Sequence, residues 1–315
     1  MIKNPPVIKK VVLAMGGVIE EFMPERGCFY INIKGKRIFI ERKISINRQS
    51  FGSVRMSKCK DITHKLLREQ GLPTPETECF YNKTYNRKDA NEKLKRLDYP
   101  IILKDAQGSN SKGIFPFVYD EKEAIAVLEN YLSKYKSMIA QQMVFGKEFR
   151  LLVLGEKIIG ALEMIPPYVV GDGVSTVEKL IKEKQLNTER QTDFDEKLLQ
   201  ILKEKNYTLK SIVPEGEKVF IKRSSCLAEG GEMRDVTDIV NSDIERICVK
   251  ASKVVGRALA GIDVICDDIS MKTDEQSFNI IEINGKPDLY IHYKPDHGKV
   301  RNVIKEIVEF MVESF

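Results

Sequence analysis

Beyond its N-terminal region, this 315-residue chain alternates short apolar strands with amphipathic helices, and that alternation constrains its fold more than any other feature. Pro100 to Lys104 (PIILK) predicts a buried strand, and Ile114 to Tyr119 predicts a second one. Asp120 and Glu123 form a capping box that predicts the start of a helix, and Met138 to Gln142 predicts a further strand. This order of elements is typical of an α/β lobe.

The second half of the chain repeats the same mixture. Two strands around a tight turn precede charged helices, a short strand, a capped amphipathic helix, a pair of apolar strands and a closing helix. The predicted ranges are Glu148 to Leu154, Lys157 to Met164, Thr176 to Lys205, Val219 to Lys222, a helix opened by Ser242 and Glu245, Ile262 to Cys266, Phe278 to Ile283 and Val300 to Met311. The pattern predicts an α/β (α+β) fold of two lobes, with a small-molecule site in the cleft between them.

The N-terminal region predicts short β segments. Lys10 to Leu13 is apolar enough for a strand, and Cys28 to Ile33 with Arg37 to Ile40 predicts a hairpin around Lys34-Gly35-Lys36. Ser57 would cap the helix that opens the next part of the chain.

Composition excludes several classes of function. The net charge of +5 arises from 51 basic and 46 acidic residues that are well mixed, which indicates small anionic ligands rather than nucleic acid. The sequence has no apolar run long enough for a membrane span and no secretion signal, so we expect a cytoplasmic protein without a membrane partner. Its six cysteines form no C-x-x-C pair, which favours reduced core thiols, and its three histidines do not have zinc-ligand spacing.

Acidic and amide side chains follow the last pair of predicted strands. Glu282 and Asn284 are two residues apart and share a face, and Asp263 on the neighbouring strand can point to the same place. Oxygen ligands of this kind suit Mg²⁺. The alternative, that they are polar residues at strand ends, is equally compatible with the pattern.

A loop of small residues follows the strand that ends at Lys104. Gly108, Ser109 and Gly113 leave backbone N–H groups accessible beside this lysine, and phosphates fit such a cradle. The loop does not have the P-loop pattern, so, as an isolated feature, an ordinary surface turn is the simpler interpretation.

Two further pairs of residues are candidates for chemistry. Glu148 and Arg150 share a strand face, where they could bind a sugar hydroxyl and an oxyanion, or form an exposed ion pair. Lys222 precedes Gly230-Gly231 and could face a reacting phosphate, although a solvated basic strand is the simpler interpretation.

The histidines have weaker signals. We expect His64 and His297 to be exposed to solvent, whereas His292 is either a group near the substrate or a structural histidine.

These features, in this order, resemble the ATP-grasp superfamily. From about Cys28 the chain is similar to the ATP-grasp module shared by cyanophycin synthetase and bifunctional glutamate–cysteine ligase/glutathione synthetase. The similar segments are KDITHKLLREQGLPTPE (60–76), YPIILKDAQGSNSKGI (99–114), AQQMVFGKEFRLLVLGEKIIGAL (140–162), PPYVVGDGVSTVEKLI (166–181), EGGEMRDVTDIV (229–240), GIDVICDDIS (261–270) and IIEINGKPDLYIH (280–292). One fold would account for all of them, and this overturns the simpler interpretations given above.

The resemblance implies a division of the chain and a set of roles. It implies a short β-rich region over 1–57, a nucleotide-binding lobe over 58–143 and a lobe with the metal and substrate site over 144–315. The implied nucleotide contacts are Lys104 with the phosphates, Gly108, Ser109 and Gly113 in the loop that closes over them, Gln141, Gln142 and Val144 with adenine, and Glu148 with ribose. Asp263, Glu282 and Asn284 would hold Mg²⁺, which Mn²⁺ could replace, and Arg150 and Lys222 would be the catalytic cations.

The activity implied is that of an ATP-dependent carboxylate–amine ligase, which forms an amide through an acyl phosphate and releases ADP and phosphate. Its substrates would be amino acids or short peptides, and a homodimer is compatible with the superfamily. Met164, Cys226, Asp288 and Tyr290 depart from the residues common in the family, which indicates an altered substrate pocket. Two alternatives are a ligase that modifies a ribosomally made peptide and a regulatory protein that binds ATP without turnover.

Overall fold

The structure, a computed structural model, describes residues 4–41, 51–108, 113–186 and 194–314. Its chain forms two compact units, one made of Met1–Ala161, Val236–Tyr293 and Arg301–Phe315, the other of Leu162–Asp235 and Lys294–Val300. We refer to them as unit 1 and unit 2. The division does not follow the predicted boundaries at residues 57 and 143, which stay a prediction.

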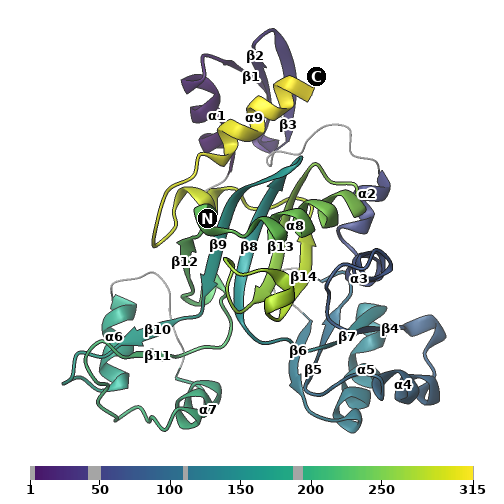
Figure 1. The fold of residues 1–315 in the computed structure, drawn as a ribbon, viewed down its shortest axis with the longest axis vertical. Coiled ribbons are helices and arrows are strands. Elements are labelled where there is room, and N and C mark those ends of the chain that lie inside the picture. The colour runs from purple at the N-terminus through teal and green to yellow at the C-terminus, as the bar shows by residue number, and fades with distance from the viewer. Residues whose placement is uncertain (1–3, 42–50, 109–112, 187–193, 315) are drawn as a thin grey trace. The chain divides into compact units, whose positions relative to one another are not determined.

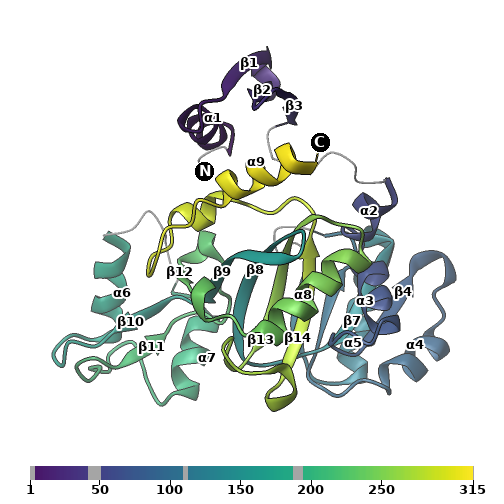
Figure 2. The same cartoon turned by 45° about the horizontal axis from the view of Figure 1, so that its top comes forward.

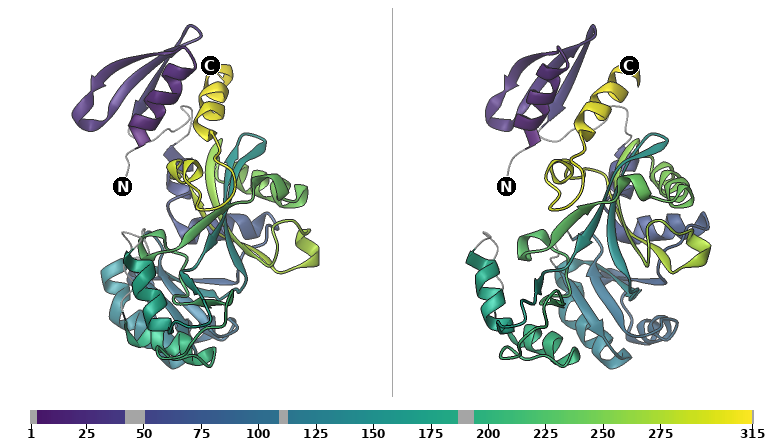
Figure 3. Two further views of the ribbon diagram at one scale, coloured as in Figure 1. Left: turned by 90° about the vertical axis from the view of Figure 1, so that its left-hand side faces the viewer. Right: turned by 60° about the vertical axis from the view of Figure 1, so that its left-hand side comes forward.

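The N-terminal part of unit 1 is a helix packed on a small sheet (Figure 3). It contains α1 (Asn4–Ala14) and the antiparallel strands β1 (Val18–Met23), β2 (Cys28–Ile33) and β3 (Lys36–Glu41). The structure has the predicted hairpin, whose turn residues Lys34 and Gly35 both have positive φ, 47° and 72°. The predicted strand over Lys10 to Leu13 is wrong. These residues belong to α1, because Ile8, Val11 and Val12 recur at helical spacing and are buried together.

A second sheet of unit 1 carries the glycine-containing loop. Its four antiparallel strands have the order β4-β7-β5-β6. The bounds are β4 (Thr77–Tyr81), β5 (Ile101–Asp105), β6 (Ile114–Val118) and β7 (Ser137–Gln142), with helices α2 (Phe51–Met56), α3 (Lys60–Glu69), α4 (Arg87–Leu94) and α5 (Glu121–Tyr135). The Asp120 carboxylate caps α5 at 2.8 Å from the Glu123 N–H, as predicted. Ser57 was the wrong cap, because α3 begins three residues later.

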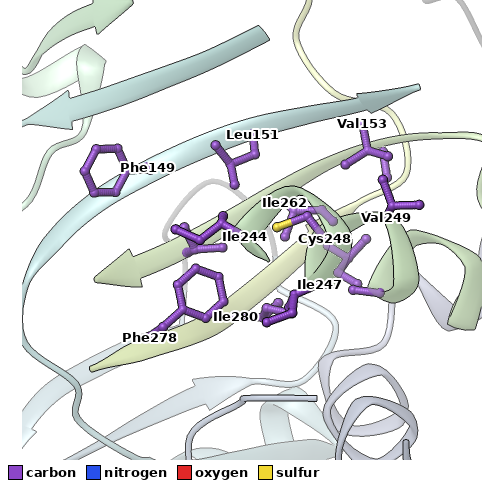
Figure 4. Close-up of a cluster of buried hydrophobic side chains, with 14 of the residues drawn as sticks. Phe149, Leu151, Val153, Ile244, Ile247, Cys248, Val249, Ile262, Phe278 and Ile280 are labelled. Carbon is purple, nitrogen blue, oxygen red and sulfur yellow. The ribbon is translucent and has the colours of Figure 1, made fainter. Parts of the chain in front are cut away.

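The largest sheet has the order β12-β9-β8-β13-β14. Its strands are β8 (Lys147–Leu154), β9 (Lys157–Ile165), β12 (Glu232–Asp235), β13 (Leu259–Cys266) and β14 (Phe278–Asn284). The remaining α-helices of unit 1 are α8 (Ser242–Val254) and α9 (Val303–Ser314). Helix α8 packs on one face of β8, β13 and β14, where Ile244, Cys248, Phe149 and Ile262 are buried together (Figure 4). The cap of α8 is Asn241, not the predicted Ser242.

Unit 2 consists of a two-stranded sheet with flanking helices (Figure 2). Its elements are β10 (Tyr168–Val170), α6 (Val177–Leu186), α7 (Glu196–Glu204) and β11 (Lys218–Phe220), together with β12, which pairs with the last residues of β9. The predicted helical and strand segments are therefore present, although Lys222 lies beyond the end of β11.

Short 3₁₀ helices occupy several connections; they span Pro24–Arg26, Asn82–Thr84, Leu227–Glu229, Thr237–Ile239, Thr273–Glu275 and Tyr290–Tyr293. None of the helices that the structure describes, of which Figure 1 labels α1 to α9, is both long and apolar enough to cross a lipid bilayer. The cysteines are all free thiols, and Cys28, Cys59, Cys248 and Cys266 are buried, as the prediction of reduced core thiols requires.

Candidate active site

Strand pairing in unit 1 brings the predicted metal ligands together. Asp263 on β13 lies directly opposite Glu282 on β14, and the Asn284 amide donates to Asp263 Oδ2 over 3.3 Å. A bulge at Asp263 and Val264 shifts the register beside this pair. The two carboxylates and the amide therefore lie within one small area of the sheet, which is the geometry that their spacing in the sequence predicted.

Arg150 lies on the other side of Asp263. The two residues are direct partners on β8 and β13, and the guanidinium donates from Nε and Nη2 to the two carboxylate oxygens over 2.7 and 3.0 Å. The negative charge of Asp263 raises the pKa of Arg150, so this guanidinium stays charged. Arg150 was predicted to share a face with Glu148; the structure shows that its bidentate partner is Asp263.

Lys104, at the end of β5, is a buried cation. Only 9% of the residue is exposed, and its ammonium donates to Gln141 Oε1 over 3.0 Å. Burial lowers the pKa of Lys104 to about 8; the carboxylate of Glu282 opposes this shift, and the charge of Lys60 adds to it. A cation that is already stripped of water is suited to phosphate oxygens, because it loses little hydration when they bind.

Lys60 is a second cation that the sequence analysis missed. Its ammonium donates to Gly108 O over 2.6 Å and lies 3.3 Å from Glu282 Oε1, so it connects the glycine-containing loop to the acidic strand. Its position in the sequence could have identified it. A lysine at the first position of a helix lies at the positive end of the helix dipole, which is unfavourable, and such a residue suggests a role other than stabilising the helix.

His64 is buried, which corrects the prediction that it is exposed. It lies on α3 one turn after Lys60, and 3% of the residue is accessible. Its Nε2 is 3.1 Å from the Gln141 amide nitrogen, and its Nδ1 contacts the Thr74 hydroxyl. Burial, assisted by the charge of Lys104, lowers the pKa of His64 to about 3, so the ring is neutral at ordinary pH.

The remaining predicted nucleotide contacts also lie in unit 1. Glu148 is half-buried on β8, and its charge acts on both Lys104 and Arg150. Gln142 ends β7, where its amide donates to Asp98 over 3.3 Å, and Val144 lies in the loop that follows.

The loop after β5 is described at its two ends. Gly113 has φ of +70°, and its carbonyl accepts from the Asp105 N–H over 2.9 Å, while Gly108 accepts from Lys60 as described above. Ser109 lies outside the described residues.

Lys222 and His297 belong to unit 2. Lys222 is half-buried just after β11, and its catalytic role stays a prediction. His297 is exposed as predicted, and its Nε2 lies 3.1 Å from Glu232. His292 belongs to unit 1, where it is buried in the 3₁₀ helix Tyr290–Tyr293 against Gly160.

The donor set of Asp263, Glu282 and Asn284 fits a hard divalent cation. Two carboxylates and an amide oxygen match the few protein ligands that Mg²⁺ takes when water and phosphate oxygens complete its shell. In the part of the chain that the structure describes, no group of three or more histidine, cysteine, aspartate and glutamate side chains is arranged to hold a metal. A site built from these residues therefore depends on the asparagine and on oxygens supplied by the ligand.

Comparison with known proteins identifies the class to which this fold belongs. A bifunctional glutathione synthetase from Pasteurella multocida superposes with a TM-score of 0.71 at 21% identity, over 98% of this chain and 43% of the other. Residues 57–167 match the family model described as a RimK-like ATP-grasp domain. The chain has the ATP-grasp fold, in agreement with the resemblance seen in its sequence.

The chain is also similar to two kinds of curated protein. It is 28% identical over 286 residues to the glutathione biosynthesis bifunctional protein GshAB of Clostridium perfringens, which covers 87% of this chain and 36% of that protein. It is 29% identical over 276 residues to the cyanophycin synthetase of Geminocystis herdmanii, which covers 84% of this chain and 31% of that protein. The chain thus spans about a third of the length of these relatives.

Proposed function

We propose that this protein is an ATP-dependent carboxylate–amine ligase that forms an amide bond through an acyl phosphate. One observation carries the proposal. Lys104 and Lys60 are poorly solvated lysines of unit 1; Lys60 lies 3.3 Å from Glu282 Oε1, and the charges of Glu282 and Asp263 act on Lys104. Cations for phosphate and oxygens for a metal are the two requirements of a site that transfers the terminal phosphate of ATP.

In this proposal each side of the site has its own task. Lys104 and Lys60 bind the phosphates beneath the loop of Gly108, Ser109 and Gly113. Gln141, Gln142 and Val144 face adenine and Glu148 binds ribose, while Asp263, Glu282 and Asn284 hold Mg²⁺. A bound Mg²⁺ would supply charge neutralisation at the transferred phosphate.

The chemistry overcomes the low reactivity of a carboxylate. A substrate carboxylate attacks the terminal phosphorus of ATP, and the bond to ADP breaks, which gives an acyl phosphate and ADP. An amine then attacks the carbonyl carbon, loses a proton, and phosphate leaves. Arg150 and Lys222 are proposed to stabilise the negative oxygen that develops in this second step. The ion pair of Arg150 with Asp263 supports that role, because it holds the guanidinium in place within the sheet.

The proposed substrates are an amino acid or short peptide as the acid and a second amino acid as the amine. The names of the relatives support this class, because glutathione and cyanophycin are both built from amino acids. This chain spans about a third of those proteins, and the test below identifies both of its substrates.

The test measures release of ADP and phosphate with Mg²⁺ against pairs drawn from the amino acids and short peptides. We expect one acid–amine pair to stimulate release and to give a product lighter than the summed substrates by one water. Tight ATP binding that no pair converts into release would favour the regulatory alternative and contradict the proposal.

A further inference from the structure

A buried chain of hydrogen bonds in unit 1 runs from Lys104 to His64. Lys104 donates to Gln141 Oε1 over 3.0 Å, and the Gln141 amide nitrogen donates to His64 Nε2 over 3.1 Å. On its far side, His64 Nδ1 contacts the Thr74 hydroxyl, which donates to the Ile280 carbonyl over 3.2 Å. Strand β5, strand β7, helix α3 and strand β14 are therefore connected through Lys104, Gln141 and His64, which are buried, and Thr74, which is half-buried.

The donors and acceptors in this chain have a single consistent direction. Because Thr74 gives its proton to Ile280 O, it must accept from His64, which places the histidine proton on Nδ1. His64 Nε2 is then an acceptor, and it receives one N–H of the Gln141 amide. The other N–H donates to the Thr77 hydroxyl over 3.0 Å, so the amide oxygen is left for Lys104.

Loss of the hydrogen bond to His64 would favour rotation of the Gln141 amide. Without an acceptor at residue 64, one amide N–H would be buried and unsatisfied, which costs more than a typical hydrogen bond contributes. The low pKa of His64 keeps its Nε2 unprotonated over the whole working range, so the acceptor is permanent. Water cannot easily replace it, because Gln141 is 1% exposed.

We propose that His64 is a positioning residue of the nucleotide site: it fixes the amide of Gln141 so that the carbonyl oxygen holds the Lys104 ammonium where ATP phosphates bind. The inference rests on the proposed function, in which Lys104 meets phosphate. His64 touches no ligand in this arrangement and acts through Gln141 alone.

The experiment compares binding of ATP and of adenosine, each with Mg²⁺, by isothermal titration calorimetry in the absence of an acid or amine. His64→Phe keeps a ring but removes the acceptor, so the affinity for ATP should fall by about 10-fold, as expected for one misplaced charge-assisted contact. Adenosine has no phosphate for Lys104 to contact, so its affinity should fall by much less than that of ATP, even though Gln141 is proposed to face adenine. His64→Gln restores an acceptor of similar reach and should recover most of the affinity for ATP.

A double-mutant cycle separates positioning from a general loss of structure. Once Gln141 is alanine, His64→Phe should have no further effect on ATP affinity, because the group through which it acts is gone. Leu67→Val is the matched control. Leu67 is buried on α3 one turn after His64 and lies outside the chain of hydrogen bonds. The packing lost in Leu67→Val should therefore leave the affinity for ATP unchanged.

Each other outcome overturns the inference. A folded His64→Phe variant that binds ATP like wild type overturns it, as does an equal loss for ATP and adenosine or additive effects in the cycle. If His64→Phe does not fold, Thr74→Val removes the partner of Nδ1 and is held to the same criteria. Wild-type protein that binds no ATP contradicts the proposed function as well, whereas wild-type binding that is insensitive to residue 64 contradicts only the role of His64.

Discussion

Each unit contains a lysine–glutamate pair, and the two glutamates differ in how many protein donors surround the carboxylate and in how much of the side chain is exposed. In unit 2, Glu232 receives Lys184 at 2.6 Å and His297 at 3.1 Å, and 16% of its side chain is exposed. In unit 1, Glu282 lies 3.3 Å from Lys60 and keeps 35% of its side chain exposed. Glu232 is enclosed by protein donors and stabilises the fold, whereas Glu282 keeps more accessible surface for a ligand.

The charge state of Glu232 supports that distinction. Burial alone would raise its pKa, but hydrogen bonds from Lys184, His297 and Tyr168 outweigh burial and lower it to about 2. The surrounding pocket, of about 410 Å³, is lined by these donors together with Val169 and Leu180. Glu232 thus connects β12 to β10 and α6 within unit 2.

The largest expected effect comes from exchanging each carboxylate for an amide. We expect Glu282→Gln to lower ATP turnover by about 100-fold or more, because a metal ligand and its charge are lost at the transferred phosphate. The matched change Glu232→Gln should leave turnover within about 3-fold of wild type, since a structural pair contributes to folding instead. Phosphate release by both variants under identical conditions measures the contrast; full turnover in Glu282→Gln would refute the metal assignment.

The second prediction concerns the buried cation. Lys104→Met should weaken ATP binding by about 30- to 100-fold, as expected for loss of a charge-assisted phosphate contact in a dry site. In wild type, the affinity for ATP should fall as pH rises above about 8, because the lysine then loses its proton. Calorimetric titration with ATP over about three pH units around that pKa measures both effects. A flat profile would contradict the role of Lys104.

The lowered pKa of Lys104 also predicts that the free energy of unfolding rises with pH. Its pKa is lower in the folded chain than in the unfolded chain, so between about pH 8 and 10 the unfolded state binds more protons. The free energy of unfolding should therefore gain up to about 2 to 3 kcal/mol from this group as pH rises through that interval. The gain should be missing in Lys104→Met, as measured by urea unfolding at a series of pH values.

A second comparison between the units uses one glycine from each. A Cβ at Gly285, just after Asn284, would lie 2.4 Å from Arg257 Nη2 and 2.5 Å from Ser57 Oγ, which are side-chain atoms able to move. A Cβ at Gly231 would lie 2.4 Å from the backbone oxygen of Ser225, which cannot move as easily. We expect Gly231→Ala to lower the free energy of unfolding by about 3 kcal/mol and Gly285→Ala by about 1 to 2 kcal/mol.

The effect on ligand binding should have the reverse order. Gly285→Ala displaces the end of the metal strand and should weaken binding of ATP with Mg²⁺, whereas Gly231→Ala, measured where it remains folded, should not. Removing the obstacle with Arg257→Ala in the Gly285→Ala background should recover part of the stability. Equal effects on ATP binding would show that Gly285 has no connection to the site.

The smallest predicted effect is the acid response of Glu232. Its folded pKa is lowered, so its contribution to stability is complete above about pH 4.5 and is lost as pH falls toward about 2. Over that interval wild type should lose about 1 to 2 kcal/mol more than Glu232→Gln in urea unfolding experiments. Identical acid profiles for the two proteins would mean that the network around Glu232 does not stabilise unit 2.

Local patterns in the sequence predicted the features that depend on neighbouring residues. Side chains two residues apart on a strand share a face, which predicted the common face of Glu282 and Asn284. The cap at Asp120 was predictable because its partner, the N–H of Glu123, is only three residues away. The turn at Lys34-Gly35 is equally local. The order of these segments then resembled one superfamily, and that resemblance supplied the fold.

Features that depend on distant contacts were not predictable in the same way. His64 lies on a charged helix, and only Gln141 and Thr74, brought in by other segments, make its burial favourable. Lys60 and Glu282 are far apart in the sequence and meet through tertiary packing. The helix over Lys10 to Leu13 was missed because a short apolar run fits a strand or a buried helix equally well.

Transfer of oxygen from a carboxylate to phosphate tests the central claim most directly. A mixture of amino acids whose carboxyl groups carry ¹⁸O would be incubated with the protein, Mg²⁺ and ATP, and the released phosphate analysed by mass spectrometry. Amide formation through an acyl phosphate predicts one ¹⁸O atom in each phosphate released with product. Phosphate that contains no ¹⁸O would show that ATP is cleaved without activation of a carboxylate, and would contradict the account.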